Sequence, residues 1–248
     1  MNDELRPPSI PPRPGASNSI DLKWILEVAT TVAMLIAAVA LTWTALSGRM
    51  LAAKARPSTE LTVPSMPVSL DGAALLGQPT APLVLMIFSD YDCPYCARFE
   101  QSILPSIKQD YVNAGLVQIA FWNFPLAIHP NARRAAESAE CAGEQGHFWE
   151  MHAKLFQDPR RVDADDATIS EAARNVGLDL EQFRNCRQTH GPAAVASDLK
   201  VGTALGIKGT PAFFIGHRVG QTVSVRATIS GARPYQDFRS VLDSQLKK

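Results

Sequence analysis

Two cysteines three positions apart, Cys93 and Cys96, are the side chains best suited to chemistry in this sequence. They follow the apolar run Leu83–Phe88, which predicts a buried strand, and the proline between them favours the first turn of a helix. There the first sulfur faces unpaired backbone N–H groups and the positive end of the helix dipole, so its thiolate is favoured. We therefore expect Cys93 to be the exchanging, nucleophilic sulfur of a redox pair, with Cys96 as its resolving partner.

The same cysteine spacing also occurs in half of a zinc site. Zinc would require two further ligands from the protein. The sequence has no second CxxC and no histidine pair at zinc-finger spacing. We therefore predict no metal at this position, and we expect no cofactor.

The elements that position the cysteine pair are predicted from hydrophobic spacing. Strands are expected at Leu83–Phe88, Leu116–Trp122, Ala212–Ile215 and Thr222–Ser230. The cysteine-bearing helix joins the first two strands, and Gly216–Gln221 is expected to join the last two as a hairpin. Residues from about 130 to 205 have helical spacing, and Pro234 opens a final amphipathic helix. This order predicts an α/β fold in which helices interrupt a sheet.

A second special backbone position is expected at Gly209-Thr210-Pro211, which leads into a strand, since proline is tolerated in a sheet only at a strand's start or edge. With these motifs the chain resembles the thioredoxin superfamily and, because helices interrupt the sheet, its DsbA-like branch. The resemblance spans about residue 79 to the C-terminus. It rests on Phe88-Ser89-Asp90-Tyr91 before the CxxC, Phe124-Pro125-Leu126 followed by His129-Pro130, and Gly209-Thr210-Pro211-Ala212-Phe213-Phe214.

The resemblance implies a thioredoxin-like fold with an inserted helical domain. It also implies a cis peptide bond before Pro211, in a loop that packs against the CxxC. The backbone of Thr210 would then pair with an extended substrate segment beside Cys93, a form of strand addition. Pro94 and Tyr95 complete the expected substrate-binding residues. The alternative is a trans proline that opens an ordinary edge strand.

The sequence departs from its relatives at two positions. Many relatives place a buried carboxylate six residues before the first cysteine, where this chain has Ile87. Proton transfer is therefore left to another group, with Asp90, Asp92 and water as candidates. Tyr95 replaces the histidine that strongly oxidising relatives carry between the cysteines, which removes one source of thiolate stabilisation.

Two histidines outside the CxxC also invite a catalytic interpretation. His129 lies at the entry to a predicted helix, and His147 precedes Phe148 and Trp149. Histidines in such places more often pack than react. We therefore interpret both as packing residues.

The remaining two cysteines, Cys141 and Cys186, fall on predicted helices of the insertion. A bond between them would close a long loop and stabilise the fold by about 3–4 kcal/mol in the chain-entropy model. We predict a structural disulfide, and the resemblance agrees, since several DsbA-like relatives bridge their helical domain in this way. Two buried free thiols are the alternative.

The N-terminal part of the chain differs in composition from the rest. We expect a disordered proline-rich tail over 1–23, a transmembrane anchor over 24–47, a linker over 48–79 and the DsbA-like domain over 80–248. The stretch from Val28 to Leu46 has no charge and would span about 28 Å as a helix, close to the roughly 30 Å of a bilayer core. A cleaved signal peptide is the alternative, but its apolar region is usually shorter.

Charge and cysteine content restrict the function further. The 24 basic and 24 acidic side chains balance, so nucleic acid is not an expected partner. Basic residues flanking the predicted anchor are equal in number and leave its orientation open. A dithiol oxidant needs an oxidising compartment, which places the domain on the periplasmic or extracytoplasmic side of the inner membrane.

We expect a protein-disulfide oxidoreductase that donates disulfides to cysteine-containing exported proteins. The resemblance implies reoxidation by a membrane partner, a quinone-linked DsbB-like protein. A reductase or isomerase on the same fold is one alternative, because exchange runs in either direction according to potential. A non-catalytic chaperone or assembly module with an idle CxxC is another.

Overall fold

The computed structural model describes residues 26, 27, 29–41, 61–157 and 166–247, which belong to two compact units divided at residue 56. In the first unit, residues 26, 27 and 29–41 are helical. Among the described residues, no helix is both long enough and apolar enough to cross a membrane. The predicted tail 1–23 lies outside the described residues, as do parts of the predicted anchor 24–47 and linker 48–79.

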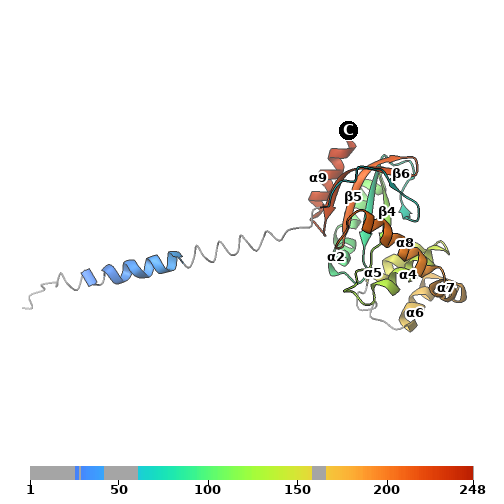
Figure 1. The fold of residues 1–248 in the computed structure, drawn as a ribbon, viewed down its shortest axis with the longest axis horizontal. Coiled ribbons are helices and arrows are strands. Elements are labelled where there is room, and N and C mark those ends of the chain that lie inside the picture. Colours follow the sequence, from blue (N-terminus) through green and yellow to red (C-terminus); the bar gives the residue numbers. More distant parts are fainter. Residues whose placement is uncertain (1–25, 28, 42–60, 158–165, 248) are drawn as a thin grey trace, which may run out of the picture. The chain divides into compact units, whose positions relative to one another are not determined.

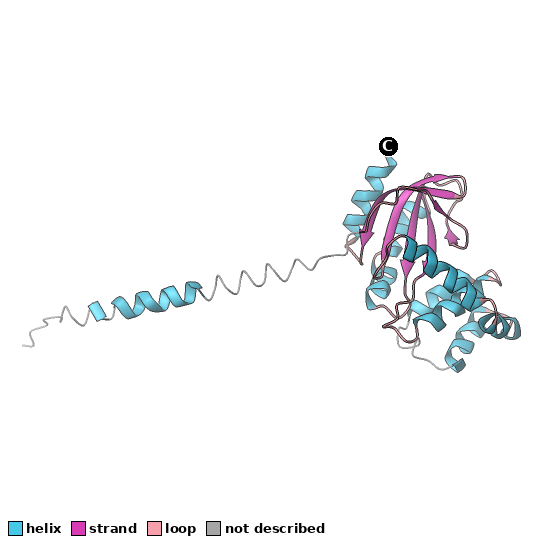
Figure 2. Cartoon of the chain, in the orientation of Figure 1, coloured by secondary structure: helices cyan, strands magenta, loops and turns pink. Residues whose placement is uncertain are grey.

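The second unit is built on a six-stranded sheet with the strand order β1-β6-β5-β3-β4-β2 (Figures 1 and 2). Its strands are β1 Val68–Ser69, β2 Ala74–Leu76, β3 Leu83–Ser89, β4 Val117–Asn123, β5 Ala212–Val219 and β6 Thr222–Ser230. Strands β3 and β4 are parallel, and the other pairs are antiparallel. The four strands expected from the sequence are therefore confirmed.

The connection between β5 and β6 is shorter than predicted. Strand β5 continues through Gly216 to Val219, with an irregularity in its pairing between Ile215 and Gly216. A Cβ atom on Gly216 would lie 2.2 Å from the carbonyl oxygen of Ser224, so glycine is needed there for close approach of two strands. The predicted hairpin connection Gly216–Gln221 is therefore too long, because Gly216 lies within β5 and permits close strand packing rather than a turn.

The folded domain also begins earlier than predicted. β1 pairs with β6 and β2 pairs with β4, so residues assigned to the C-terminal end of the linker 48–79 belong to the sheet. These strands are two and three residues long. Segments this short carry no alternation that could distinguish them from a tether.

Helices cover the sheet and form the insertion (Figure 2). Strand β3 is followed by α2 Pro94–Ser102, α3 Leu104–Ile107 and the π-helix η1 Lys108–Val112. The insertion contains α4 Ala132–Gly143, α5 Phe148–Gln157, α6 Asp166–Val176, α7 Leu180–Gln188 and α8 Gly191–Ala204, and α9 Tyr235–Leu246 follows β6. The predicted α/β fold with an inserted helical segment is confirmed.

Both faces of the sheet are buried, which explains the unbroken apolar run of β3. Alternate residues of this strand enter two different cores. One core contains Leu83, Leu85 and Ile87 and is shared with α2, α9 and the inserted helices. The other contains Val84, Met86 and Phe88 and is closed by the C-terminal half of α8. The end of β3, and therefore the start of α2, is held from both sides.

Candidate active site

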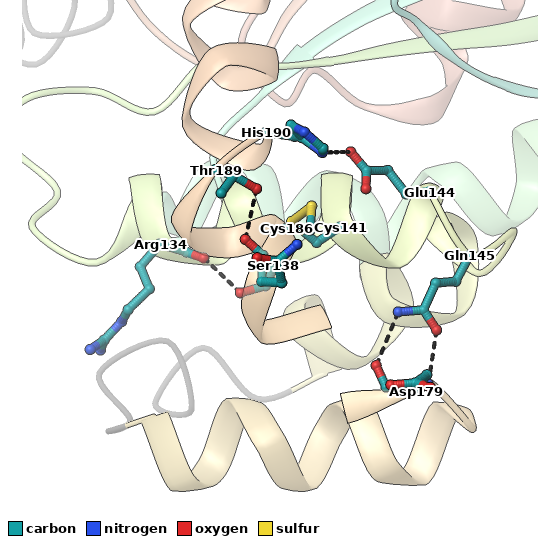
Figure 3. Close-up of a disulfide and its surroundings, with 10 residues drawn as sticks. Arg134, Ser138, Cys141, Glu144, Gln145, Asp179, Cys186, Thr189 and His190 are labelled. Atoms are coloured by element: carbon teal, nitrogen blue, oxygen red, sulfur yellow. Dashed lines mark hydrogen bonds and ion pairs between the residues drawn. A yellow bond between two sulfur atoms is a disulfide. The ribbon is translucent and has the colours of Figure 1, made fainter. Parts of the chain in front are cut away.

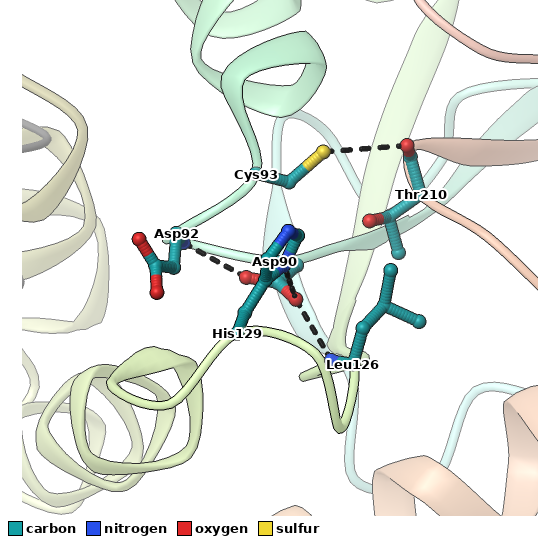
Figure 4. A network of polar contacts seen from close by, with 6 residues as sticks. All are labelled: Asp90, Asp92, Cys93, Leu126, His129 and Thr210. Atoms are coloured by element: carbon teal, nitrogen blue, oxygen red, sulfur yellow. Dashed lines mark hydrogen bonds and ion pairs between the residues drawn. The ribbon is translucent and has the colours of Figure 1, made fainter.

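Cys93 is the capping residue at the N-terminus of α2. Its backbone is extended, with φ −86° and ψ 120°, and Pro94 lies in the first helical turn. Its sulfur lies 3.4 Å from the carbonyl oxygen of Thr210 (Figure 4). The peptide bond between Thr210 and Pro211 is cis, as expected. The start of α2 and the loop before β5 therefore meet at this sulfur.

The two thiols of the CxxC have different environments. Hydrogen bonding from Cys96 lowers the pKa of Cys93 to about 6; burial opposes this shift, while Thr210 and the backbone N–H groups of Cys96 and Tyr95 support it. Burial raises the pKa of Cys96, and the neighbouring Cys93 raises it further. Near neutral pH the pair therefore carries a thiolate on Cys93 and a proton on Cys96.

The predicted substrate-binding residues lie around this pair. Tyr95 is 58% exposed, and Pro94 beside it is exposed as well. Thr210 is partly buried, and Pro211 is buried under it. The molecule thus presents an apolar patch at the helix start next to the Thr210 backbone.

A buried carboxylate ties the loop before α2 to the loop after β4. The Asp90 side chain, 0% exposed, accepts hydrogen bonds from the backbone N–H groups of Asp92 and Leu126, both at 2.8 Å. The Nδ1 atom of His129 lies 2.8 Å from Asp90 Oδ2 (Figure 4). The His129 ring therefore makes a specific polar contact near the cysteine pair in addition to its packing. Sequence spacing gave no sign of this contact across 39 residues.

A second polar cluster at the end of β4 was not predicted. Asn123 donates from Nδ2 to Glu140 Oε1 at 2.6 Å and to Asp198 Oδ2 at 3.1 Å. Burial raises the pKa of Glu140 to about 8, and the charge of Asp198 adds to this. Burial also raises the pKa of Asp198 to about 7, against the hydrogen bonds from Asn123. Acidic residues within the apolar helical stretches were the signal that could have identified this cluster.

A third cluster fixes α5 against α2. The hydroxyl of Tyr91 lies 3.0 Å from His152 Nδ1, and His152 Nε2 lies 3.1 Å from Glu100 Oε2. All three side chains are largely buried. The other histidine named above, His147, has 40% of its side chain exposed and lies 3.9 Å from Glu150.

Cys141 and Cys186 are joined by a disulfide that links α4 to α7 (Figure 3). Both cysteines are buried. A Cβ atom on Gly191 would lie 2.9 Å from the Cys141 sulfur, so this glycine allows the start of α8 to pack against the bridge. In the part of the chain that the structure describes, no group of three or more His, Cys, Asp or Glu side chains could hold a metal ion.

Comparison with known proteins identifies the family. A family model described as Thioredoxin, Thioredoxin_4, matches residues 69–243. The chain therefore belongs to the thioredoxin family. With helices inserted in the fold and the Cys93–Cys96 pair at the start of α2, its architecture resembles that of the DsbA proteins.

The chain covers most of some relatives and only a small part of others. The crystal structure of alpha-DsbA1 from Wolbachia pipientis matches with a TM-score of 0.63 and 22% identity, covering 73% of this chain and 94% of that one. The probable disulfide bond formation protein D of Bacillus anthracis is 25% identical over 182 residues, which are 70% of this chain and 78% of the relative. The Na(+)/H(+) antiporter NhaA 3 of Salinispora tropica is 34% identical over 157 residues, 62% of this chain. The chain spans only 23% of that antiporter's length.

Proposed function

We propose that this enzyme is an oxidase that donates the disulfide of Cys93 and Cys96 to exported proteins. The observation that carries the proposal is the asymmetry of the pair: the Cys93 sulfur lies at the N-terminus of α2 against Thr210, whereas Cys96 is buried one turn further on. A stabilised Cys93 thiolate favours the reduced enzyme and therefore the transfer of the disulfide to a client. The name of the Bacillus anthracis relative supports the same direction.

The proposed reaction has two exchange steps. A client thiolate attacks the Cys93 sulfur of the oxidised pair, the bond to Cys96 breaks, and Cys96 leaves and takes up a proton. The second client thiolate then attacks the client sulfur of the mixed disulfide and displaces Cys93 as a thiolate. The client loses two electrons and gains a disulfide, and the enzyme gains both electrons. The low pKa of Cys93 favours the second step, because Cys93 is the leaving group there.

The client is proposed to bind as an extended segment beside Cys93. The Thr210 backbone would pair with it, and Pro94, Tyr95 and Pro211 would contact its side chains. Exposure of Tyr95 at the helix start supports this role, since an exposed aromatic side chain offers apolar contact without sequence specificity.

We further propose a single-pass anchor over 24–47 in the inner membrane, preceded by the tail 1–23 and followed by a tether from residue 48 to the first strand. The uncharged stretch from Val28 to Leu46 supports the anchor. The catalytic domain would lie on the periplasmic or extracytoplasmic side. The Cys141–Cys186 disulfide supports that side, because structural disulfides persist in oxidising compartments. A quinone-linked DsbB-like membrane protein would reoxidise the pair, and no nucleic acid takes part.

The test uses the oxidised full-length chain in detergent and a reduced peptide with two cysteines. Mass spectrometry should show one peptide disulfide formed per enzyme molecule, with Cys93 and Cys96 reduced. The His147→Gln chain, altered at a partly exposed histidine away from the pair, should behave like the unmodified chain. If the reduced chain instead reduces the peptide disulfide and the oxidised chain leaves the dithiol unchanged, the enzyme is a reductase. The tyrosine at position 95 makes that the competing candidate, since it lacks the charge of a histidine there.

A further inference from the structure

The loop before the reactive cysteine is acidic. Asp90 and Asp92 both lie within three residues of Cys93. All three groups that contact the Asp90 carboxylate are placed as donors: two backbone N–H groups and the His129 ring nitrogen. The carboxylate is fully buried, and these three donors are the groups that favour its charged form there.

A fixed negative charge beside a thiol disfavours its thiolate. The acidic loop should therefore oppose ionisation of Cys93, yet the pKa of Cys93 is lowered to about 6. Hydrogen bonds from Cys96 and Thr210 lower it directly. A cation beside the loop would offset its negative charge and leave burial as the opposing effect.

His129 has the geometry of that cation. Because Asp90 Oδ2 accepts, His129 Nδ1 carries the hydrogen, and Nε2 is the atom that gains or loses a proton. The side chain of His129 is 17% exposed, so Nε2 can exchange protons with solvent. In Figure 4 the ring lies beside Asp90 in the same group of residues as Cys93 and Asp92.

We propose that His129, fixed by Asp90, is a positioning residue for thiol exchange, whose protonated ring offsets the acidic loop and stabilises the Cys93 thiolate. The charged and titratable groups that act on the ring come from the loop before α2, as Asp90 and Asp92, and from the start of α2, as Cys93. From the loop before β5, the carbonyl oxygen of Thr210 contacts the Cys93 sulfur, and Thr210 carries no charge.

The electrostatics of His129 agree with this role. Burial opposes its protonation, but the hydrogen bond and charge of Asp90, together with the charges of Cys93 and Asp92, raise its pKa overall. Coupling between two sites is reciprocal. If the Cys93 thiolate favours the protonated ring, the protonated ring favours the thiolate by the same free energy. The effect does not depend on whether the enzyme oxidises or reduces its clients, so its test is separate from that of the proposed function.

The first test measures thiolate absorbance at 240 nm against pH in the reduced full-length chain. His129→Gln keeps an amide donor for Asp90 and removes the charge. We expect the ionisation midpoint of Cys93 to rise by about 0.5–1 pH unit, which is about three- to tenfold less thiolate well below the midpoint. His129→Lys should recover part of the loss, and His147→Gln should have no effect. An unchanged midpoint in a folded His129→Gln chain would overturn the proposal.

The second test needs no variant at His129. The pKa of the His129 ring is measured by NMR in the reduced chain and in a Cys93→Ser chain. Reciprocity predicts that the ring loses its proton at lower pH once the thiolate is absent, by a shift equal to that of Cys93 in the first test. Equal His129 pKa values in the two chains would refute the coupling, even if His129→Gln fails to fold.

Discussion

The two cysteine pairs of this protein are equally buried but differ in the groups that surround them. Cys93 and Cys186 are each 4% exposed, and Cys96 and Cys141 are each 0% exposed. Cys93 and Cys96 lie at the start of α2, next to the loop that contains Thr210 and Pro211 and the loop that contains Asp90. The other pair joins the last turn of α4 to the last turn of α7, next to the start of α8. Exposure therefore does not distinguish the reactive pair from the structural one.

The difference lies in which groups face the sulfur. The Cys96 side chain and the backbone of the first helical turn lower the pKa of Cys93 and favour its thiolate, and the Thr210 side chain acts in the same direction. Cys141 and Cys186 themselves lie in the last turns of α4 and α7, where backbone N–H groups bond within their own helix, and Gly191 at the start of α8 packs against Cys141. Free donors at a helix start make a sulfur reactive, and a helix interior leaves it inert.

The largest expected effect separates the pairs by activity. Cys93→Ser should reduce peptide oxidation by about 1000-fold or more, because the residual chain has no sulfur that can form the mixed disulfide at the helix start. Removal of the other bridge, by Cys141→Ala with Cys186→Ala, should leave the rate per folded molecule within about twofold. Loss of activity in both variants, with both folded, would show that the pairs exchange with each other.

The next effect separates the pairs by stability. The Cys141→Ala, Cys186→Ala chain should lose about 3–4 kcal/mol of unfolding free energy, since the bridge closes a loop between residues 45 apart. Reduction of Cys93–Cys96, which closes only a four-residue segment, should change it far less. Urea unfolding followed by circular dichroism measures both. A larger loss for the CxxC pair would contradict the structural role given to the bridge.

Helix α4 connects the two regions, because Glu140 faces Asn123 while the adjacent Cys141 forms the bridge. The folded pKa of Glu140, about 8, lies above its ordinary 4.5, so the folded state holds the proton more tightly than the unfolded state. This contribution to stability is present below about pH 4.5 and is lost as pH rises to about 8. We expect a fall of about 1–3 kcal/mol between pH 5 and 8, which Glu140→Gln reduces but does not remove, because Asp198, with a pKa raised to about 7, titrates in the same range.

The matched control for that variant is Glu171→Gln, at an exposed position on α6. It should leave the pH dependence of unfolding unchanged. If Glu140→Gln retains the full pH dependence, the titrating group lies elsewhere.

The smallest expected effect concerns the packing over the bridge. Gly191→Ala would bring a Cβ atom to 2.9 Å from the Cys141 sulfur and 3.3 Å from the carbonyl oxygen of Glu137. We expect a loss of about 1–2 kcal/mol without loss of exchange activity. Gly209→Ala, whose Cβ would meet nothing within 4 Å, is the stability control. Thermal unfolding of both variants decides whether Gly191 is required, and equal melting temperatures would show that it is not.

Much of the fold and of the cysteine chemistry could be predicted because the signals are local. The apolar run of β3, the CxxC after it and the proline before β5 are each contained in a few residues. β1 and β2 could not be predicted, because two or three residues have no periodicity.

The polar contacts at the site were also beyond prediction. Asp90 meets His129 across 39 residues, and Asn123 meets Asp198 across 75. In the sequence alone, each of these side chains could be interpreted as an exposed residue or a helix cap. Only the folded chain brings them together, because the parallel strands β3 and β4 end at the same edge of the sheet and the middle of α8 lies against the end of β4.

The reduction potential of the Cys93–Cys96 pair tests the oxidase proposal most directly. The full-length chain in detergent is equilibrated with graded glutathione buffers, its thiols are trapped, and the two redox states are counted by mass. A potential less negative than about −220 mV, above the glutathione pool, is the predicted result. A potential near the roughly −270 mV of thioredoxin would contradict it and assign the enzyme to the reductases.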